Sequence, residues 1–430
     1  MKPIKRLLFD VSYTRTQSVS VGITRTVNRL REEFEALVPA NRTAFVPVVF
    51  HTQGFRSLQE DNYGAFDLPG KPVQRSLWAK TLHWITTGPI RRIVAMHFPL
   101  ALRRLAWLIF SWWEFNRLAK DLPVIDIEPG DVVFLCDASW NYRVWTAVRL
   151  AKRKGARVVA VMYDLIPLRH PEFCPKLTVL AFRRWIKALL ENSDVVICIS
   201  EATEIDLRKY IREVHVVSPV IGHFRLGADP VRKLSEGVAR PVLDMFTVGS
   251  GPCFGAVGSF EPKKNYMFLV SVFERLWCKG LNVRLVIAGR PAPECLADIN
   301  RVQKHPEYGN RLMILLDASD WEINLIYSRC RALVFPSLAE GFGLPLVEAR
   351  ALGCPVIASD LPVFVELMDE GVHIFDRFSM DSLEMRLLEH THSDLRLSVP
   401  PMPQFSWRDS AKQCLEIMDN LLTPTKGNDS

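Results

Sequence analysis

Two glutamates stand eight positions apart in the stretch EGFGLPLVEA, which begins at Glu340 and carries Glu348 near its end. Gly341 and Gly343 lie between them and can let the backbone approach a ligand closely. Pro345 suits the first turn of a helix, where free N–H groups and the helix dipole favour an anion such as phosphate. Two carboxylates beside a phosphate would repel it unless they contact other parts of the ligand. The pair therefore indicates contacts with sugar hydroxyls, for example a ribose diol and a hexose.

The same stretch also permits a plainer interpretation. Glu348 would then be an ordinary glutamate in the first turn of a helix, where it complements the dipole, and the loop before it would merely turn the chain. Both interpretations place Glu348 in the first turn and Glu340 in the preceding loop.

Short apolar runs alternate with helical patterns, such as 22–37 and 176–191, over most of the chain. The runs are continuous, as is typical of strands covered on both faces in a parallel sheet. The expected strands are RLLFDV, AFVPVVF, VVFLC, RVVAVMY and DVVICI in the first half, and CFGAVG, VRLVIAG, RLMILL, ALVFP, PVIAS and VHIF in the second. A chain of 430 residues exceeds the length at which one core keeps growing, so two doubly wound α/β domains are predicted, with a linker near 230–252. Ligands of such sheets bind beyond the carboxyl ends of the strands.

The basic charge is concentrated in one segment. Residues 75–120 hold eight Lys or Arg and one acidic residue, Glu114, while the formal net charge of the whole chain is +7. On a helix over 100–119 the basic side chains would share one arc, opposite a face rich in Trp, Leu and Phe. Such a helix could lie on the inner membrane surface, or it could pack on the core with a solvated basic face. Nucleic acid is not expected as a partner, because aromatic residues in one stripe do not interleave with bases.

The cysteines and histidines show no spacing typical of metal ligands. We interpret the cysteines as reduced packing residues of a cytoplasmic protein, and the N-terminus is too briefly apolar for a secretory signal. Ser200 is expected to cap a helix rather than act as a nucleophile. The sequence HTH at 390–392 is interpreted as a surface turn.

Several motifs together resemble the retaining GT-B glycosyltransferases of family four, which transfer sugars from nucleotide diphosphate donors. The strongest is the glutamate pair in EGFGLPLVEA. The others follow in the family's order: VGITRTVNRL at 21–30, YDLIP at 163–167, ISEAT at 199–203, RLGAD at 225–229, GSFEPKKN at 258–265 and PVIASDLPVFVE at 355–366. The resemblance implies two Rossmann-like domains facing a central cleft: an acceptor-side domain over 1–235 with the basic insertion near 75–120, and a nucleotide-sugar domain over 250–405. A final helix over 406–422 is expected to return to the first domain.

The resemblance also implies roles for individual residues. Glu348 would hold the ribose, Glu340 the transferred hexose and Lys264 the diphosphate. The backbone around Gly341, Phe342, Gly343 and Leu344 would meet the phosphate or sugar, and Gly22 would give the first domain access to the donor. Asp164 is a candidate for positioning acceptor or sugar hydroxyls, although a loop or capping aspartate is an equal alternative.

This chain departs from the family's pattern at two positions. Many relatives carry an arginine six residues before the loop lysine, where this chain has Gly258. Lys263 or Arg290 could replace that arginine as a phosphate contact. Many relatives also have a histidine before the aspartate of YDLIP, where this chain has Tyr163.

The implied activity is retaining transfer of a hexose to a glycan or lipid-linked saccharide acceptor in surface polysaccharide synthesis. GDP-mannose is the expected donor and a UDP-hexose the alternative, and no metal or further cofactor is expected. The usual proposal for this family is front-face attack, in which the leaving phosphate takes the acceptor's proton. A non-catalytic sugar-binding or nucleotide-binding paralogue is the rival function.

Overall fold

The computed structural model describes residues 4–17, 22–38, 43–58, 119–141, 144–228, 240–246, 251–392, 399–403 and 405–422. Most of the basic segment predicted near 75–120 lies outside these residues. The chain forms two compact units: unit 1 comprises the described residues up to Arg225 together with Trp407–Leu422, and unit 2 runs from Leu226 to Ser406. No helix in the described part of the chain combines the length and the apolar character needed to cross a lipid bilayer.

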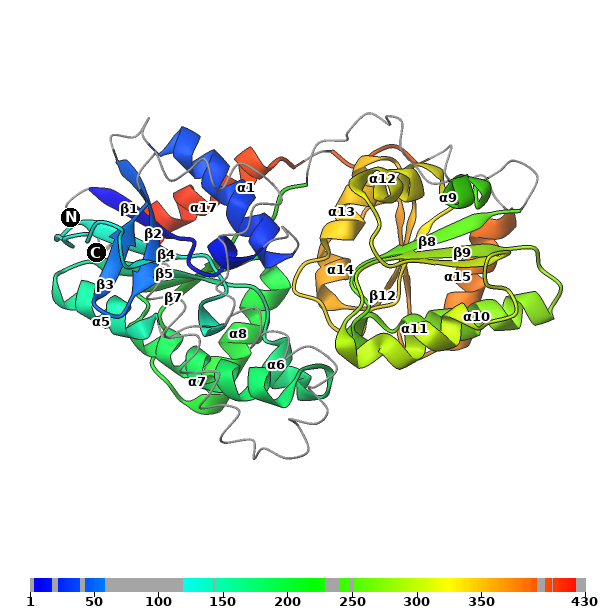
Figure 1. Ribbon diagram of the computed structural model, residues 1–430, viewed down its shortest axis with the longest axis horizontal. Helices are drawn as coiled ribbons and strands as arrows, with labels where there is room; N and C mark the ends of the chain where they lie inside the picture. Colours follow the sequence, from blue (N-terminus) through cyan, green and yellow to red (C-terminus); the bar gives the residue numbers. More distant parts are fainter. Residues whose placement is uncertain are drawn as a thin grey trace, which may run out of the picture. The chain divides into compact units, whose positions relative to one another are not determined.

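Unit 1 is built on a seven-stranded sheet in the order β3-β2-β1-β4-β5-β6-β7, with α1 and α17 on one face and α5, α7 and α8 on the other (Figure 1). Neighbouring strands are parallel except for β2 and β3, which are antiparallel. Its elements are β1 (Arg6–Asp10), η1 (Thr14–Thr16), α1 (Ile23–Leu37), β2 (Ala44–His51), β3 (Gly54–Ser57), β4 (Asp131–Leu135), η4 (Ser139–Asn141), α5 (Trp145–Arg153), β5 (Arg157–Met162), α6 (Ile166–Arg169), η5 (Pro171–Phe173), α7 (Lys176–Asn192), β6 (Val195–Cys198), α8 (Glu201–Val214), β7 (Val220–His223) and α17 (Trp407–Leu422).

Unit 2 has a six-stranded parallel sheet in the order β10-β9-β8-β11-β12-β13. Helices α10, α11 and α15 cover one face, and α12, α13 and α14 cover the other (Figure 1). Its elements are α9 (Arg240–Asp244), β8 (Cys253–Val257), η6 (Pro262–Lys264), α10 (Tyr266–Cys278), β9 (Arg284–Ala288), η7 (Pro293–Cys295), α11 (Leu296–Gln303), β10 (Leu312–Leu315), α12 (Asp320–Arg329), β11 (Leu333–Phe335), α13 (Leu344–Ala351), β12 (Val356–Ser359), α14 (Pro362–Glu366), β13 (Val372–Phe375) and α15 (Met380–His392).

The prediction of two doubly wound α/β domains is confirmed, and every strand expected from a continuous apolar run is present. Strands β4 and β9 in the middle of the sheets are buried throughout, whereas the edge strands β10 and β13 are only partly buried. Strands β3 and β7 were not predicted, because GFRS and VIGH are short and only partly apolar. The predicted linker near 230–252 contains the short helix α9, whose Asp244 carbonyl accepts a hydrogen bond from Arg284 at 2.8 Å.

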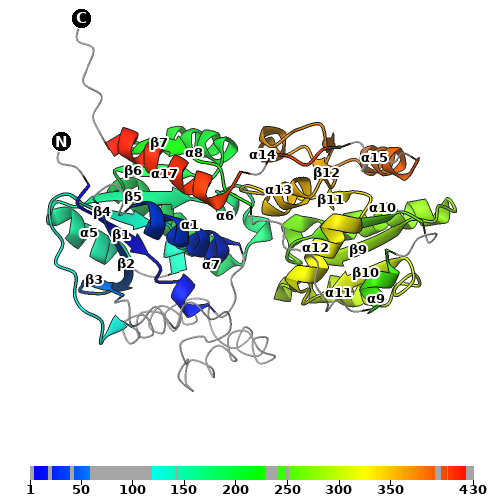
Figure 2. The same ribbon diagram turned by 90° about the horizontal axis from the view of Figure 1, so that it is seen from above.

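Helix α17 follows unit 2 in the sequence but belongs to unit 1. It packs there against α1, β6 and β7 (Figure 2). Gly222 on β7 makes close packing possible, because a Cβ at this position would lie 3.0 Å from the Ile417 side chain. Arg157 also donates a hydrogen bond to the last carbonyl of the helix, at Leu422, over 2.7 Å.

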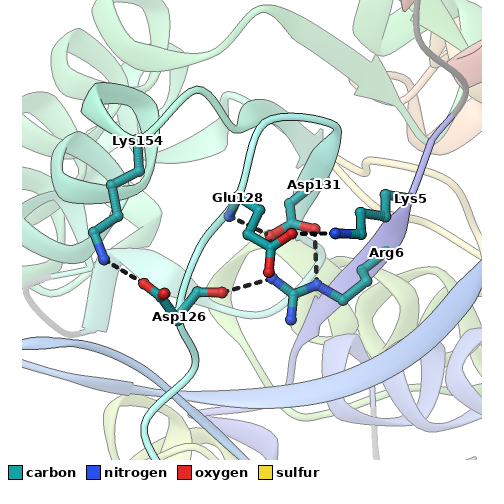
Figure 3. Close-up of polar contacts among 6 residues, drawn as sticks. All are labelled: Lys5, Arg6, Asp126, Glu128, Asp131 and Lys154. Carbon is teal, nitrogen blue, oxygen red and sulfur yellow. Dashed lines mark hydrogen bonds and ion pairs between the residues drawn. The ribbon is translucent and has the colours of Figure 1, made fainter.

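A network of charged side chains fixes the amino ends of β1 and β4 (Figure 3). Arg6 lies opposite Asp131 in the register of the two strands and binds both of its carboxylate oxygens, at 2.8 and 2.5 Å. Lys5 pairs with Glu128, and Lys154 pairs with Asp126 at 2.6 Å. Asp131 is fully buried, so its two-oxygen contact with Arg6 compensates the cost of removing its charge from water.

The prediction of a surface turn at 390–392 is wrong, because these residues end helix α15. His390 is fully buried, its Nδ1 lies 2.8 Å from the Arg386 carbonyl, and its ring meets that of His373 edge-on at 4.6 Å between centroids. Burial lowers the pKa of both imidazoles. Arg386, Glu389, Arg350 and Asp369 are the charged groups around them.

We predict that this histidine pair makes unit 2 sensitive to acid. The pKa of each ring is lowered in the folded state, so below pH about 6.5 the unfolded chain takes up protons that the folded chain does not. Stability is therefore lost as the pH falls, at up to about 1.4 kcal/mol per pH unit for each ring. His390→Gln should narrow the difference in melting temperature between pH 7.5 and pH 5.5.

The matched control is His215→Asn, because His215 is exposed and has a φ of 53°, which asparagine tolerates. The wild-type pH dependence should persist in that variant. Equal pH dependence in His390→Gln and His215→Asn would contradict the prediction.

Candidate functional site

The candidate site of unit 2 lies where the strand order reverses. Strands β8 and β11 are neighbours in the sheet although two strands, β9 and β10, and three α-helices, α10, α11 and α12, separate them in sequence. The turn η6 follows β8, and the loop over 336–343 follows β11, so both leave the sheet at adjacent carboxyl ends. A hydrogen bond of 2.7 Å from the Leu338 N–H to the Lys263 carbonyl joins them. This geometry is where doubly wound sheets bind ligands.

Lys264 and Glu340 meet at this point although they are 76 residues apart in sequence. The Lys264 ammonium forms an ion pair and a hydrogen bond with Glu340 Oε1, and the Ser337 hydroxyl donates to the same oxygen at 2.7 Å. Lys264 Nζ also lies 4.8 Å from the centre of the Phe335 ring, within cation–π range. Lys264 is 8% exposed, so the pair holds two opposite charges in a largely desolvated place.

Burial by itself would raise the pKa of Glu340. The charges of Lys264 and Lys263, together with hydrogen bonds from Lys264 and Ser337, outweigh this effect and hold the pKa below its usual value. Glu340 is therefore an anion at neutral pH, able to accept hydrogen bonds from hydroxyl groups. The neighbouring strand β12 holds Ser337 in place, because the Ser337 carbonyl accepts a hydrogen bond from the Ser359 hydroxyl at 2.6 Å.

Gly258 occupies the position where the family resemblance leads one to expect an arginine. Its φ is 152°, a value that L-residues rarely adopt, and a Cβ there would lie 3.0 Å from the Tyr266 hydroxyl and 3.4 Å from Lys264 Nζ. The Gly258 carbonyl accepts a hydrogen bond from that same hydroxyl, also at 3.0 Å. Tyr266 and Lys264 thus fill the space that a side chain at 258 would need.

Lys263 and Arg290, the two candidates to replace the family's arginine as a phosphate contact, lie at the edge of the site. Lys263 pairs with Glu261 at 3.4 Å. Arg290 is exposed, and its nearest acid is Asp317 at 4.0 Å. The charge of Lys263 nevertheless acts on Glu340, whose pKa it helps to lower.

The glycine loop leads directly into helix α13. Gly343 is the N-cap with a φ of 108°, and a Cβ at this position would come within 2.8 Å of the Phe364 ring. Leu344 is the first helical residue and Pro345 follows it, while Phe342 is buried at 3% exposure. Glycine is therefore required at 343 both by backbone conformation and by space.

The placement of Glu348 in the first turn is wrong. Helix α13 begins at Leu344, so Glu348 is its fifth residue, and the first turn contains no acid. The interpretation of Glu348 as a dipole-complementing residue accordingly loses its basis, since that effect is confined to the first turn. The side chain is partly buried, and Oε2 accepts a hydrogen bond from the Tyr327 hydroxyl at 3.0 Å.

The remaining candidate residues belong to unit 1. Asp164 lies in the loop after β5, where its Oδ1 accepts from the Ile166 N–H at 2.9 Å at the start of α6. Gly22 is the N-cap of α1 with a φ of 52°, a value that favours glycine. Within the described part of the chain, no atom lies within 4 Å of a Cβ built on it. Tyr163 is buried and donates to the Cys136 carbonyl at 2.6 Å, which makes it a packing residue.

A buried carboxylate pair at the equivalent strand reversal of unit 1 was not predicted. Asp10 ends β1 and Asp137 follows β4, and both are at most 2% exposed. Burial, and then the charge of Asp10, raise the pKa of Asp137 to about 7. Asp137 accepts from the backbone and hydroxyl of Thr14, at 2.7 and 2.9 Å, and so ties the loop after β1 to the end of β4.

Two contacts of the unit 2 site were also missed. Ser337 could have been found, because it precedes Glu340 by three residues in a loop where a hydroxyl commonly reaches a carboxylate. Tyr327 carried no signal, since it lies on a different helix from Glu348. Among the described residues, no group of three or more His, Cys, Asp or Glu side chains is placed to hold a metal ion.

Two family models match this chain. The model described as "Glycosyltransferase Family 4" matches residues 46–222, and the model described as "Glycosyl transferases group 1" matches residues 248–396. Together they cover most of unit 1 and of unit 2. The second match contains Lys264, Glu340 and Glu348.

Similar proteins include two bacterial mannosyltransferases. The serotype-specific mannosyltransferase WbdA of Escherichia coli is 34% identical over 269 residues, which are 60% of this chain and 33% of that protein. The O-antigen chain mannosyltransferase RfbU of Salmonella typhimurium is 34% identical over 272 residues, 63% of this chain and 66% of that protein. This chain thus aligns with only about a third of the length of WbdA.

Solved structures support the fold. The sucrose-phosphate synthase of Thermosynechococcus elongatus superposes with a TM-score of 0.60 at 16% identity, over 97% of this chain and 99% of that one. The two doubly wound, mainly parallel sheets, the paired family models and this likeness all indicate the same fold. The chain belongs to the GT-B glycosyltransferases and is similar to O-antigen mannosyltransferases.

Proposed function

We propose that this chain transfers a hexose, with retention of anomeric configuration, from a nucleotide diphosphate sugar to a glycan or lipid-linked saccharide acceptor in surface polysaccharide synthesis. The observation that carries the proposal is the buried pair of Lys264 and Glu340 beside α13, which bears Glu348. GDP-mannose is the proposed donor, because WbdA and RfbU are named as mannosyltransferases.

The proposed roles of the residues follow from the charges that develop during the reaction. When the bond between the sugar and the diphosphate breaks, negative charge grows on the leaving group and positive charge on the sugar ring. Lys264 offers three N–H donors, of which the contact with Glu340 occupies one, so it can stabilise the departing phosphate. The backbone N–H groups at the start of α13 act on the same charge.

Glu340 and Glu348 contact uncharged parts of the donor in this proposal. Glu340 accepts from hexose hydroxyls and stabilises positive charge on the ring, while Lys264 neutralises the repulsion between this carboxylate and the diphosphate. Glu348 accepts from the ribose diol. Asp164 positions acceptor or sugar hydroxyls, and the leaving phosphate takes the acceptor's proton.

A thermal-shift panel of nucleotides and nucleotide sugars tests the proposal. A ligand at 100 times its dissociation constant should stabilise the protein by about 2.7 kcal/mol, so the preferred donor should raise the melting temperature measurably. We expect GDP and GDP-mannose to give the largest shifts. A larger shift with UDP-hexoses would change the donor but keep the enzyme class, and no shift with any nucleotide would refute the proposal. Binding without transfer would indicate a non-catalytic paralogue.

A second prediction separates the two glutamates. Glu348→Gln keeps the side-chain shape but removes charge-assisted hydrogen bonds worth roughly 1.5 to 3 kcal/mol each, so affinity for the bare nucleotide diphosphate should fall about tenfold or more. Because the ribose is also present in the intact donor, the affinity for the donor should fall to a similar extent. Calorimetric titration with the nucleotide measures this directly.

Glu340→Gln is the matched control. It should not weaken binding of the nucleotide diphosphate, because the Lys264 ammonium remains and loses its carboxylate partner. It should lower the rate of transfer, because the contact of Glu340 with the hexose strengthens as the ring gains positive charge. If both variants bind nucleotide and turn over like the parent, the assignment of the glutamate pair is wrong.

We also propose that the basic segment over 75–120 holds the enzyme at an anionic membrane surface, where a lipid-linked acceptor is presented. The residues concerned lie outside the described part of the chain. Replacing Arg91, Arg92, Arg103 and Arg104 by Gln should release the protein from vesicles that contain anionic lipid, without changing nucleotide affinity. Vesicle cosedimentation that is the same for parent and variant would reject this.

A further inference from the structure

Tyr327 connects the ribose-binding candidate Glu348 to a second helix. The tyrosine lies near the end of α12 and is 2% exposed, and its hydroxyl is 3.0 Å from Glu348 Oε2 on α13. An ionised carboxylate has no proton to give, so the phenol is the donor. The contact therefore favours one orientation of the Glu348 carboxylate plane.

Helix α12 is a rigid support for this hydroxyl. Its first turn is closed by a capping box, in which the Ser319 hydroxyl accepts from the Glu322 N–H and the Glu322 carboxylate accepts from the Ser319 N–H at 2.8 Å. Its inner face lies directly on β8, where Gly255 leaves room: a Cβ at 255 would come within 2.4 Å of the Ile326 side chain. The residue next to Tyr327 is thus fixed against the sheet.

The two helices are also joined beyond the tyrosine. Cys330, just after α12, places its Sγ 3.4 Å from Sγ of Cys354, which follows α13. Both cysteines are fully buried. Tyr327 and Glu348 consequently lie on helices whose relative position is set by packing, and the phenol can determine how the carboxylate points.

We infer that Tyr327 is a positioning residue that orients Glu348 for two-point binding of a ribose diol. This rests on the proposed function, because Glu348 has a ribose to bind only if the ligand is a nucleotide. A carboxylate that accepts from two neighbouring hydroxyls must present both oxygens in the plane of the diol. A glutamate free to rotate would lose rotamer entropy on binding, and the Tyr327 hydrogen bond removes that cost beforehand.

The experiment compares nucleotides with and without the diol. GDP and 2′,3′-dideoxy-GDP, with the corresponding uridine pair in parallel, are titrated into the parent and into Tyr327→Phe. The parent should prefer GDP to the dideoxy compound. Tyr327→Phe removes one oxygen atom and should lower the affinity for GDP about tenfold. The affinity for the dideoxy nucleotide should stay within about twofold of the parent, so the ratio of the two affinities falls towards one. Loosening of the helix alone would weaken both nucleotides equally, and that result would overturn the inference.

Three further variants make the outcome specific. Glu348→Gln should also abolish the preference. The double variant with Tyr327→Phe should bind GDP only slightly more weakly than Glu348→Gln alone, because both residues act through the same contact with the ribose. Tyr163→Phe removes another buried phenol hydrogen bond, in unit 1, and should leave the ratio as in the parent. If Glu348→Gln keeps the preference, the ribose role of Glu348 fails and the inference fails with it. If Glu348→Gln loses the preference but Tyr327→Phe keeps it, only the role of Tyr327 is refuted.

Discussion

The ion pair of Lys264 and Glu340 is the interaction on which the site of unit 2 depends. Two opposite charges in a largely buried place are costly unless each finds partners. Here the partners come from two neighbouring strands. Phe335 ends β11 and Ser337 follows it, and Ser359 at the end of β12 donates a hydrogen bond to the Ser337 carbonyl. The reversal of strand order between β8 and β11 is what makes the pair possible, because it places two loops far apart in sequence at neighbouring positions of one sheet edge.

Residues that stabilise the sheets and residues with a proposed functional role lie at different places in each unit. In unit 1 the Arg6 and Asp131 contact lies at the amino ends of β1 and β4, whereas Asp10 and Asp137 lie at their carboxyl ends. In unit 2 the charged residues with a proposed role in catalysis are on loops at the carboxyl ends, and the buried strands beneath them are apolar. Loops at that edge can therefore carry polar and charged groups without disturbing the cores.

Much of this fold could be predicted because its strands are covered on both faces. Continuous apolar runs are the direct consequence of that burial, and each of those runs forms a strand. Ser200 likewise caps α8 through a hydrogen bond from the Thr203 N–H, as its position before a helical pattern predicted. Lys264 and Glu340 were both selected from sequence, the first by resemblance, but their direct contact was not foreseen. The contact of Tyr327 with Glu348 could not be predicted, because helix-to-helix contacts depend on packing that local spacing does not record. The error at 390–392 has a similar origin: a short polar triplet looked like a turn, although these residues end α15 and tertiary packing buries His390.

Gly258 has a consequence for substitutions at this position. An arginine there would have to adopt a backbone conformation that L-residues avoid, and its Cβ would press on the Tyr266 hydroxyl and the Lys264 ammonium. A single substitution therefore requires a change of backbone conformation at 258 together with a shift of the Tyr266 hydroxyl or the Lys264 side chain. The effects of substitutions at 258 and 266 are thus expected to be non-additive, because the two side chains compete for the same space.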